Sequence, residues 1–95
     1  MPRRAAKTDR NQTETVGALR GIGCSVVSLA AVGDGVPDLL VGCRGINILM
    51  EIKDGQKMPS ERKLTPDQVE FHSTWRGRIY VVESIDDALK IINEL

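Results

Sequence analysis

Two acidic residues and a lysine lie on segments that otherwise predict buried strands. Asp38 opens the segment DLLVG, and Glu51 and Lys53 stand near the end of the segment INILMEIK. Side chains alternate between the two faces of a strand, so Glu51 and Lys53 share one face. If the two segments form an antiparallel hairpin, the start of the first lies beside the end of the second. The sequence therefore predicts that both carboxyl groups and the ammonium group meet at one end of the hairpin.

Convergent carboxylates of this kind suit a hard divalent cation, which binds oxygen ligands and keeps positions open for water and phosphate. Lys53 beside such an ion would orient an attacking water or stabilise developing charge. The simpler alternative is a cross-strand salt bridge between Lys53 and either acid. Segments so rich in aliphatic residues are expected to be covered on both faces, where unpaired acids are costly, and this favours a chemical use for Asp38 and Glu51.

The elements that must position these residues are indicated by turn residues, capping signals and apolar periodicity. Thr65 and Gln68 form a T-x-x-Q capping box, and Ser84 and Asp87 form a second box, S-x-x-D, at the start of an amphipathic helix. The predicted elements are a helix over about 8–20, strands over 24–30, 38–42 and 46–53, an exposed loop over 54–64, a helix over 66–76, a strand over 78–83 and a last helix from 85. The predicted order is α-β-β-β-α-β-α.

Composition limits the class of protein. A chain of 95 residues with 41% hydrophobic content suits one domain over 1–95, in which about 1–7 form a basic, flexible tail. The formal net charge of zero argues against a simple electrostatic DNA binder. One histidine and two cysteines without C-x-x-C spacing argue against zinc. We expect structural thiols, a reducing cytoplasmic compartment, no membrane span and no organic cofactor.

The motifs together resemble a known family. PD, a short hairpin and EIK look like the PD-(D/E)XK nuclease superfamily, and GDGVPDLLV, ILMEIKDG, RKLTPDQVEFHSTW and RIYVVESIDDALKII are similar to stand-alone VRR-NUC (virus-type replication-repair nuclease) domains. The similarity extends from about Thr8 to the end of the chain. It implies an α/β fold of the restriction-endonuclease type, with an αβββαβ core plus a C-terminal helix and a central mixed sheet flanked by helices.

The resemblance also implies roles for single residues. Asp38 and Glu51, helped by the backbone carbonyl of Ile52, would bind Mg²⁺ or Mn²⁺, and Lys53 would be the catalytic lysine. Glu14 would be a further metal ligand, although a glutamate on a polar helix is equally explained as a solvated surface residue. Gln68 would complete the catalytic set, which is compatible with its capping role.

Other residues have weaker signals. His72 could be a general base or a packing or surface residue, and we favour packing or surface. Phe71 and Trp75 are expected in the core rather than on a nucleobase. Four basic residues are candidate phosphate contacts or plain surface charges. They are Arg44 in the hairpin turn and Lys57, Arg62 and Lys63 in the loop.

The function that the resemblance implies is a metal-dependent DNA endonuclease. Nothing in the chain predicts a recognition helix for the major groove, so we expect it to select DNA by structure rather than by sequence. The resemblance implies that the substrate is branched DNA, such as a Holliday junction. The resemblance further implies a homodimer and a phage or mobile-element source. The alternatives are a flap or nicking nuclease that acts with a replication or repair partner, and a non-catalytic DNA-binding module.

Overall fold

A computed structural model describes residues 10–95, so the expected basic tail over 1–7 lies outside the described residues. The elements are α1 (Arg10–Gly21), β1 (Ser25–Ser28), β2 (Leu39–Cys43), β3 (Ile46–Ile52), a short 3-10 helix η1 (Pro59–Glu61), α2 (Pro66–Thr74), β4 (Ile79–Val82) and α3 (Ile85–Asn93). The order and the expected α/β fold class are confirmed. The difference is η1, which forms inside the segment that was expected to be irregular.

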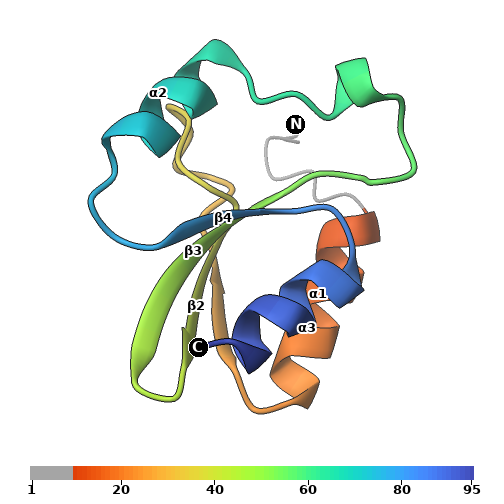
Figure 1. The fold of residues 1–95 in the computed structure, drawn as a ribbon, viewed down its shortest axis with the longest axis vertical. Coiled ribbons are helices and arrows are strands. Elements are labelled where there is room, and N and C mark those ends of the chain that lie inside the picture. Colours follow the sequence, from red (N-terminus) through yellow and green to blue (C-terminus); the bar gives the residue numbers. More distant parts are fainter. Residues whose placement is uncertain (1–9) are drawn as a thin grey trace, which may run out of the picture.

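The four strands form one mixed sheet in the order β1-β2-β3-β4 (Figure 1). β1 pairs with β2 and β2 with β3 in antiparallel fashion, whereas β4 runs parallel to β3. The connection from β3 to β4 therefore has to cross from one end of the sheet to the other, and it contains η1 and α2. This crossover brings α2 over the residues at the end of β3.

The helices lie on different sides of the sheet. α1 and α3 pack beside each other against one face, and α2 lies apart from them (Figure 1). The hydrophobic core fills the space between that face and the α1–α3 pair, and alternate residues of β3 point into it. Its fully buried members include Leu19, Val41, Ile48, Met50, Ala88 and Ile92. The face of β3 that carries Glu51 and Lys53 is thus turned away from the core, towards α2.

The hairpin between β2 and β3 closes through Arg44 and Gly45. Cys43 is paired with Ile46, so the loop contains two residues, and both have positive φ, 56° for Arg44 and 79° for Gly45. Two positive φ values are typical of a type I′ turn, whose twist matches that of the strands. The turn lies at the end of the hairpin opposite Asp38 and Glu51, which separates Arg44 from these acids.

Both predicted helix caps form, with one difference. At α2, the Thr65 side chain accepts from the Gln68 amide and the Gln68 side chain accepts from the Thr65 amide, which is the complete capping box. At α3, the Ser84 hydroxyl accepts from the Asp87 amide, but the Asp87 carboxylate accepts from the amide of Glu83, 3.0 Å away, rather than from Ser84. The second box is therefore shifted by one residue and holds the end of β4.

The cysteines lie at neighbouring ends of β1 and β2, and both are free thiols. Burial, together with a contact to Cys43, raises the pKa of Cys24 to about 11, so this thiol is uncharged at neutral pH. Among the helices over 10–95, none is both long and apolar enough to cross a membrane.

Candidate active site

The hairpin brings Asp38 and Glu51 together. Leu39 is paired with Met50, so the preceding residue, Asp38, lies beside Glu51 on the next strand. The Oδ2 atom of Asp38 accepts a hydrogen bond of 2.7 Å from the amide of Ile52. This bond holds the Asp38 side chain against the end of β3, where the sequence placed the three charged groups.

Glu51 is almost completely buried, with 2% of its surface exposed. Burial raises the pKa of its carboxyl group, and the neighbouring Asp38 carboxyl raises it further, to about 8, against a smaller opposing effect of the Lys53 charge. Burial and the adjacent carboxyl both disfavour the charged form of Glu51, so this side chain keeps its proton at neutral pH. A bound cation would remove this conflict by replacing the proton.

Gln68 connects the acid, the lysine and the helix cap through one side chain. Its Nε2 atom donates to Oε2 of Glu51 over 3.1 Å, and its Oε1 atom accepts from Nζ of Lys53 over 2.9 Å. The same Oε1 atom accepts from the backbone amide of Thr65, also at 2.9 Å. The capping and catalytic interpretations of Gln68 are therefore not exclusive, because the cap orients the amide that contacts Glu51 and Lys53.

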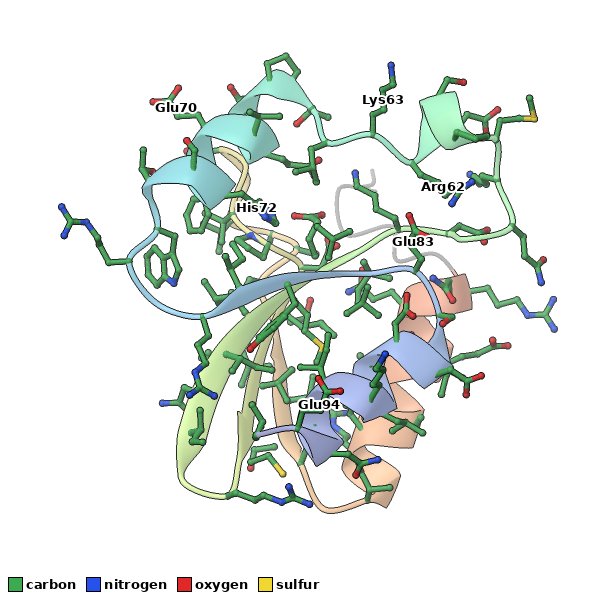
Figure 2. All side chains as sticks on the ribbon, in the orientation of Figure 1. Arg62, Lys63, Glu70, His72, Glu83 and Glu94 are labelled. Atoms are coloured by element: carbon green, nitrogen blue, oxygen red, sulfur yellow. The ribbon has the colours of Figure 1, made fainter. Side chains whose placement is uncertain are left out.

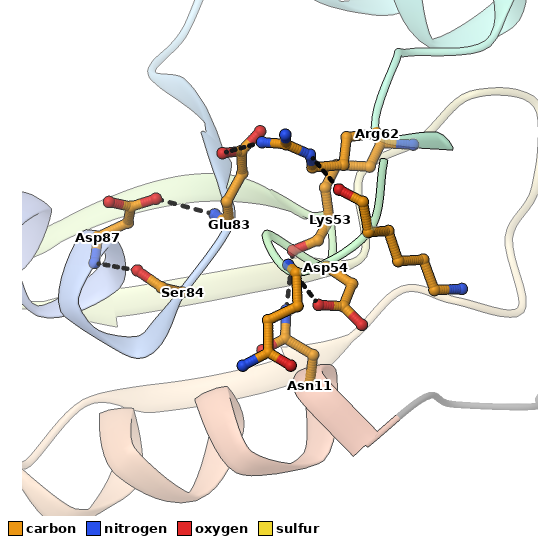
Figure 3. Close-up of polar contacts among 9 residues, drawn as sticks. Asn11, Lys53, Asp54, Arg62, Glu83, Ser84 and Asp87 are labelled. Carbon is orange, nitrogen blue, oxygen red and sulfur yellow. Dashed lines mark hydrogen bonds and ion pairs between the residues drawn. The ribbon is translucent and has the colours of Figure 1, made fainter. Parts of the chain in front are cut away.

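The backbone of Lys53 is held from the other side by α1. Nδ2 of Asn11 donates a hydrogen bond of 2.8 Å to the carbonyl oxygen of Lys53, and Figure 3 shows Asn11 rising from α1 to meet it. Asn11 was not among the residues expected from the sequence. The only available signal was its position one turn before Thr15, a buried residue on the inward face of the first helix.

His72 also faces the site. It lies four residues after Gln68 on α2, and Figure 2 shows it projecting from the helix towards the strands. Its Nε2 atom is 3.9 Å from Oε1 of Glu51, and both of these buried atoms lack a hydrogen-bond partner. Burial, followed by the charge of Lys53, lowers the pKa of His72, which makes the imidazole neutral at physiological pH. The packing role expected for His72 leaves this contact unexplained.

The donor set fits a hard divalent cation. Asp38 and Glu51 offer carboxylate oxygens, and Oε1 of Glu51 is buried without a partner. Glu14 is not gathered with them, since its side chain is half exposed and bonded to Arg10 over 3.1 Å. Within residues 10–95, no three His, Cys, Asp or Glu side chains are arranged to hold a metal ion. In the described part of the chain, the side chains that the site offers to a cation are therefore the two carboxylates of Asp38 and Glu51.

The four candidate DNA contacts fall into two groups. Lys57 and Lys63 are exposed, and Figure 2 shows Lys63 pointing away from the protein. Arg62 instead donates to the carbonyl of Lys57 over 2.9 Å and forms a 3.1 Å ion pair with Glu83, which fastens the loop to the end of β4. Arg44 donates to the carbonyl of Ile92 over 3.1 Å, at the C-terminal end of α3. Both arginines have structural partners.

An open cleft of about 790 Å³ is lined by residues 54–56, by the start of α1 and by the start of α3. Its walls are mainly acidic, as the cap of α3 in Figure 3 illustrates. The charged lining residues are Arg10, Glu14, Asp54, Glu83, Asp86 and Asp87. Among the described lining residues, five acids stand against one arginine, and this balance of charge is unfavourable for a phosphate backbone.

Comparisons with known proteins agree with this geometry. No protein-family model and no curated protein matches the chain. A solved structure described as a "VRR_NUC domain" superposes with a TM-score of 0.66 and is 30% identical. The match covers 88% of this chain and 91% of the other.

Proposed function

The chain belongs to the VRR-NUC family of nuclease domains, and on this premise we propose that it is a divalent-metal-dependent endonuclease that hydrolyses DNA phosphodiesters. The observation that carries the proposal is the linkage of Glu51, Gln68 and Lys53 by two hydrogen bonds, with Asp38 beside Glu51. A salt bridge of purely structural value would pair Lys53 with an acid directly. Here Lys53 bonds to a neutral amide, which leaves both acids available.

Asp38 and Glu51 would hold Mg²⁺ or Mn²⁺, and the carbonyl of Ile52 and the carboxylate of Glu14 are the further ligands we propose. Glu14 would have to leave Arg10 to take part, which costs little because the pair is exposed. When bound, the cation supplies Lewis-acid chemistry, because it neutralises charge on the phosphate and makes a water molecule more acidic. A site of carboxylate and carbonyl oxygens is suited to either metal.

Lys53 would act at the phosphate. Its ammonium group is held by Oε1 of Gln68, and its backbone carbonyl is held by Asn11, so both ends of the residue are restrained. A restrained cation orients an attacking water or stabilises the charge that develops on the phosphate oxygens. Gln68 would contribute by holding Lys53 and Glu51 at a constant separation.

DNA would approach from the side of the 54–64 loop. The acidic cleft beside α1 repels phosphates, whereas Lys57 and Lys63 are exposed on the loop that follows Lys53. Arg62 would support these contacts by fastening the loop to Glu83. Contacts to phosphates position a duplex without reading its sequence, so we propose that the enzyme selects DNA by shape.

We further propose that the substrate is branched DNA, such as a Holliday junction, and that the active form is a homodimer. The total exposed surface of the described chain, about 6070 Å², is small for gripping a branch, whereas a two-fold dimer would present two sites to opposed strands. The same chemistry would also serve a flap or nicking nuclease. The choice between these substrates depends on the experiment below.

The test is a comparison of substrates at equal protein concentration. Four-way junctions, flaps, nicked duplex and linear duplex are incubated with Mn²⁺ or Mg²⁺, and the protein mass is measured by light scattering. We expect paired symmetric cuts in the junction and a dimeric mass. Preferential cleavage of flaps or nicks would favour the flap or nicking enzyme. Binding without cleavage of any substrate would contradict the proposed activity and indicate a binding module.

A further inference from the structure

His72 and Glu51 present two buried polar atoms to each other without a bond between them. Nε2 of His72 and Oε1 of Glu51 are 3.9 Å apart, and neither has another hydrogen-bond partner. A hydrogen bond between such atoms spans about 2.7–3.2 Å, so the observed distance is too long for one. Facing, unsatisfied groups of this kind are uncommon in folded proteins because each costs free energy. A movement of the ring by roughly 1 Å would satisfy both at once.

The second oxygen of Glu51 shows what this contact would complete. Oε2 already accepts a hydrogen bond from Nε2 of Gln68, which lies one turn before His72 on the same face of α2. With His72 bonded to Oε1, the helix would hold both oxygens of the carboxylate. The orientation of the carboxylate plane relative to Asp38 would then be determined by α2.

We propose that His72 is a positioning residue for the metal site: its Nε2–H group donates to Oε1 of Glu51 and orients this carboxylate towards a cation shared with Asp38. The inference rests on the proposed function, because it assumes that a divalent cation binds there. His72 acts through Glu51 in this arrangement and is not itself a ligand. Donors that orient a liganding carboxylate commonly contribute 10- to 100-fold to metal affinity.

Replacement of His72 by glutamine or by asparagine separates this role from packing, because the two side-chain amides extend to different distances from the helix. The side-chain nitrogen of glutamine reaches about as far as Nε2 of histidine, whereas that of asparagine falls short by one methylene group. His72→Gln therefore keeps a donor for Glu51, and His72→Asn and His72→Phe remove it. The binding of Mn²⁺ to each folded protein is measured by titration calorimetry in the absence of DNA, and thermal unfolding in EDTA checks that each variant is folded.

We expect His72→Asn and His72→Phe to weaken Mn²⁺ binding by roughly 10-fold or more, and His72→Gln to bind within about threefold of the wild type. Equal binding by all four proteins, or equal weakening by Gln and Asn, would overturn the inference. Electron spin echo measurements on the Mn²⁺ complex add a second check, since imidazole nitrogen coupling that disappears in His72→Gln would show direct ligation instead. Failure of the wild type to bind Mn²⁺ would contradict the proposed function itself, and the inference with it.

Discussion

The ammonium nitrogen of Lys53 donates a hydrogen bond of 2.9 Å to the side-chain oxygen of Gln68. The same amide donates to Glu51, so the lysine and the acid are connected without touching each other. This relationship explains why an acid-rich strand end can remain ordered without direct salt bridges. It also connects Gln68, a member of the capping box of α2, to both Lys53 and Glu51.

Gln68 should matter for activity more than for stability. Gln68→Glu keeps an oxygen for Lys53 and for the Thr65 amide but places a second oxygen against Oε2 of Glu51, whereas Gln68→Ala removes every contact. We expect both variants to lower the cleavage rate by about 10- to 100-fold. Only Gln68→Ala should also lose its part of the capping box, about 1 kcal/mol in urea unfolding.

The control for this comparison is Glu70→Gln, which changes an exposed residue on the same helix. It should leave both the cleavage rate and the unfolding free energy close to those of the wild type. Wild-type cleavage by Gln68→Glu would show that the amide donor to Glu51 is dispensable, contrary to the account given above.

The buried Glu51 should make the metal-free protein less stable as pH rises. Its pKa is raised from 4.5 in the unfolded chain to about 8 in the folded protein, so the folded state binds this proton more tightly. The resulting stability is fully present below about pH 4.5 and is lost as pH rises through 8. His72 acts in the opposite direction, because its pKa is lowered, and its contribution fades as pH rises past its ordinary value of 6.5.

The window from pH 6.5 to 8 therefore reports mainly on Glu51. In EDTA, the unfolding free energy of the wild type should fall by about 1 kcal/mol per pH unit relative to Glu51→Gln, which cannot ionise at this position. Urea unfolding at several pH values measures the difference. Parallel curves for the two proteins would mean that Glu51 is already ionised in the folded state at neutral pH.

Much of the fold was predictable from the sequence because the capping and turn residues agree with the pattern of apolar residues in the strands and helices. The T-x-x-Q box, the hairpin turn that contains Arg44 and the period-2 pattern of 46–53 each specified a local structure that the fold uses. The position of Asp38 beside Glu51 followed from hairpin geometry alone. The sequence could not show the contacts between distant segments, such as Asn11 with Lys53 over 42 positions.

The arginines are a second case in which contacts between distant segments could not be predicted from the sequence. Arg44 and Arg62 are basic residues in a turn and a loop, where phosphate contacts are expected from sequence. In the fold, the guanidinium group of Arg44 bonds to Ile92, and that of Arg62 bonds to Lys57 and Glu83. No pattern in the sequence distinguishes a bonded arginine from a free one. The exposed Lys57 and Lys63 have the same signal, and only the fold separates the two groups.

This distinction predicts opposite phenotypes for Arg44 and Lys63. Arg44→Ala removes a hydrogen bond to the last turn of α3 and should lower stability by about 1 kcal/mol while DNA affinity stays within twofold. Lys63→Ala should leave stability unchanged and weaken DNA binding at low salt, with a shallower dependence on salt concentration. Thermal unfolding and fluorescence anisotropy measure the two properties. A loss of DNA affinity in Arg44→Ala at unchanged stability would restore it as a phosphate contact.

Asn11 should support Lys53 from a distance. Asn11→Ala leaves the carbonyl of Lys53 without its side-chain donor, which should cost about 1 kcal/mol of stability and lower cleavage by a smaller factor than any change of Lys53 itself. Asn11→Asp is nearly the same size but places an oxygen against that carbonyl, so it should lower both stability and cleavage more than Asn11→Ala does. If Asp and Ala behave alike, the hydrogen bond contributes nothing beyond packing.

The central claim is that Lys53 and a divalent cation together perform phosphodiester hydrolysis. The most direct measurement is cleavage of a labelled four-way junction by the wild type and by Lys53→Ala, each with EDTA, Mg²⁺ or Mn²⁺, with binding followed in parallel. We expect cleavage by the wild type only with metal, and a loss of at least about 100-fold in Lys53→Ala with DNA and Mn²⁺ binding retained. Cleavage in EDTA, or undiminished cleavage by Lys53→Ala, would contradict it.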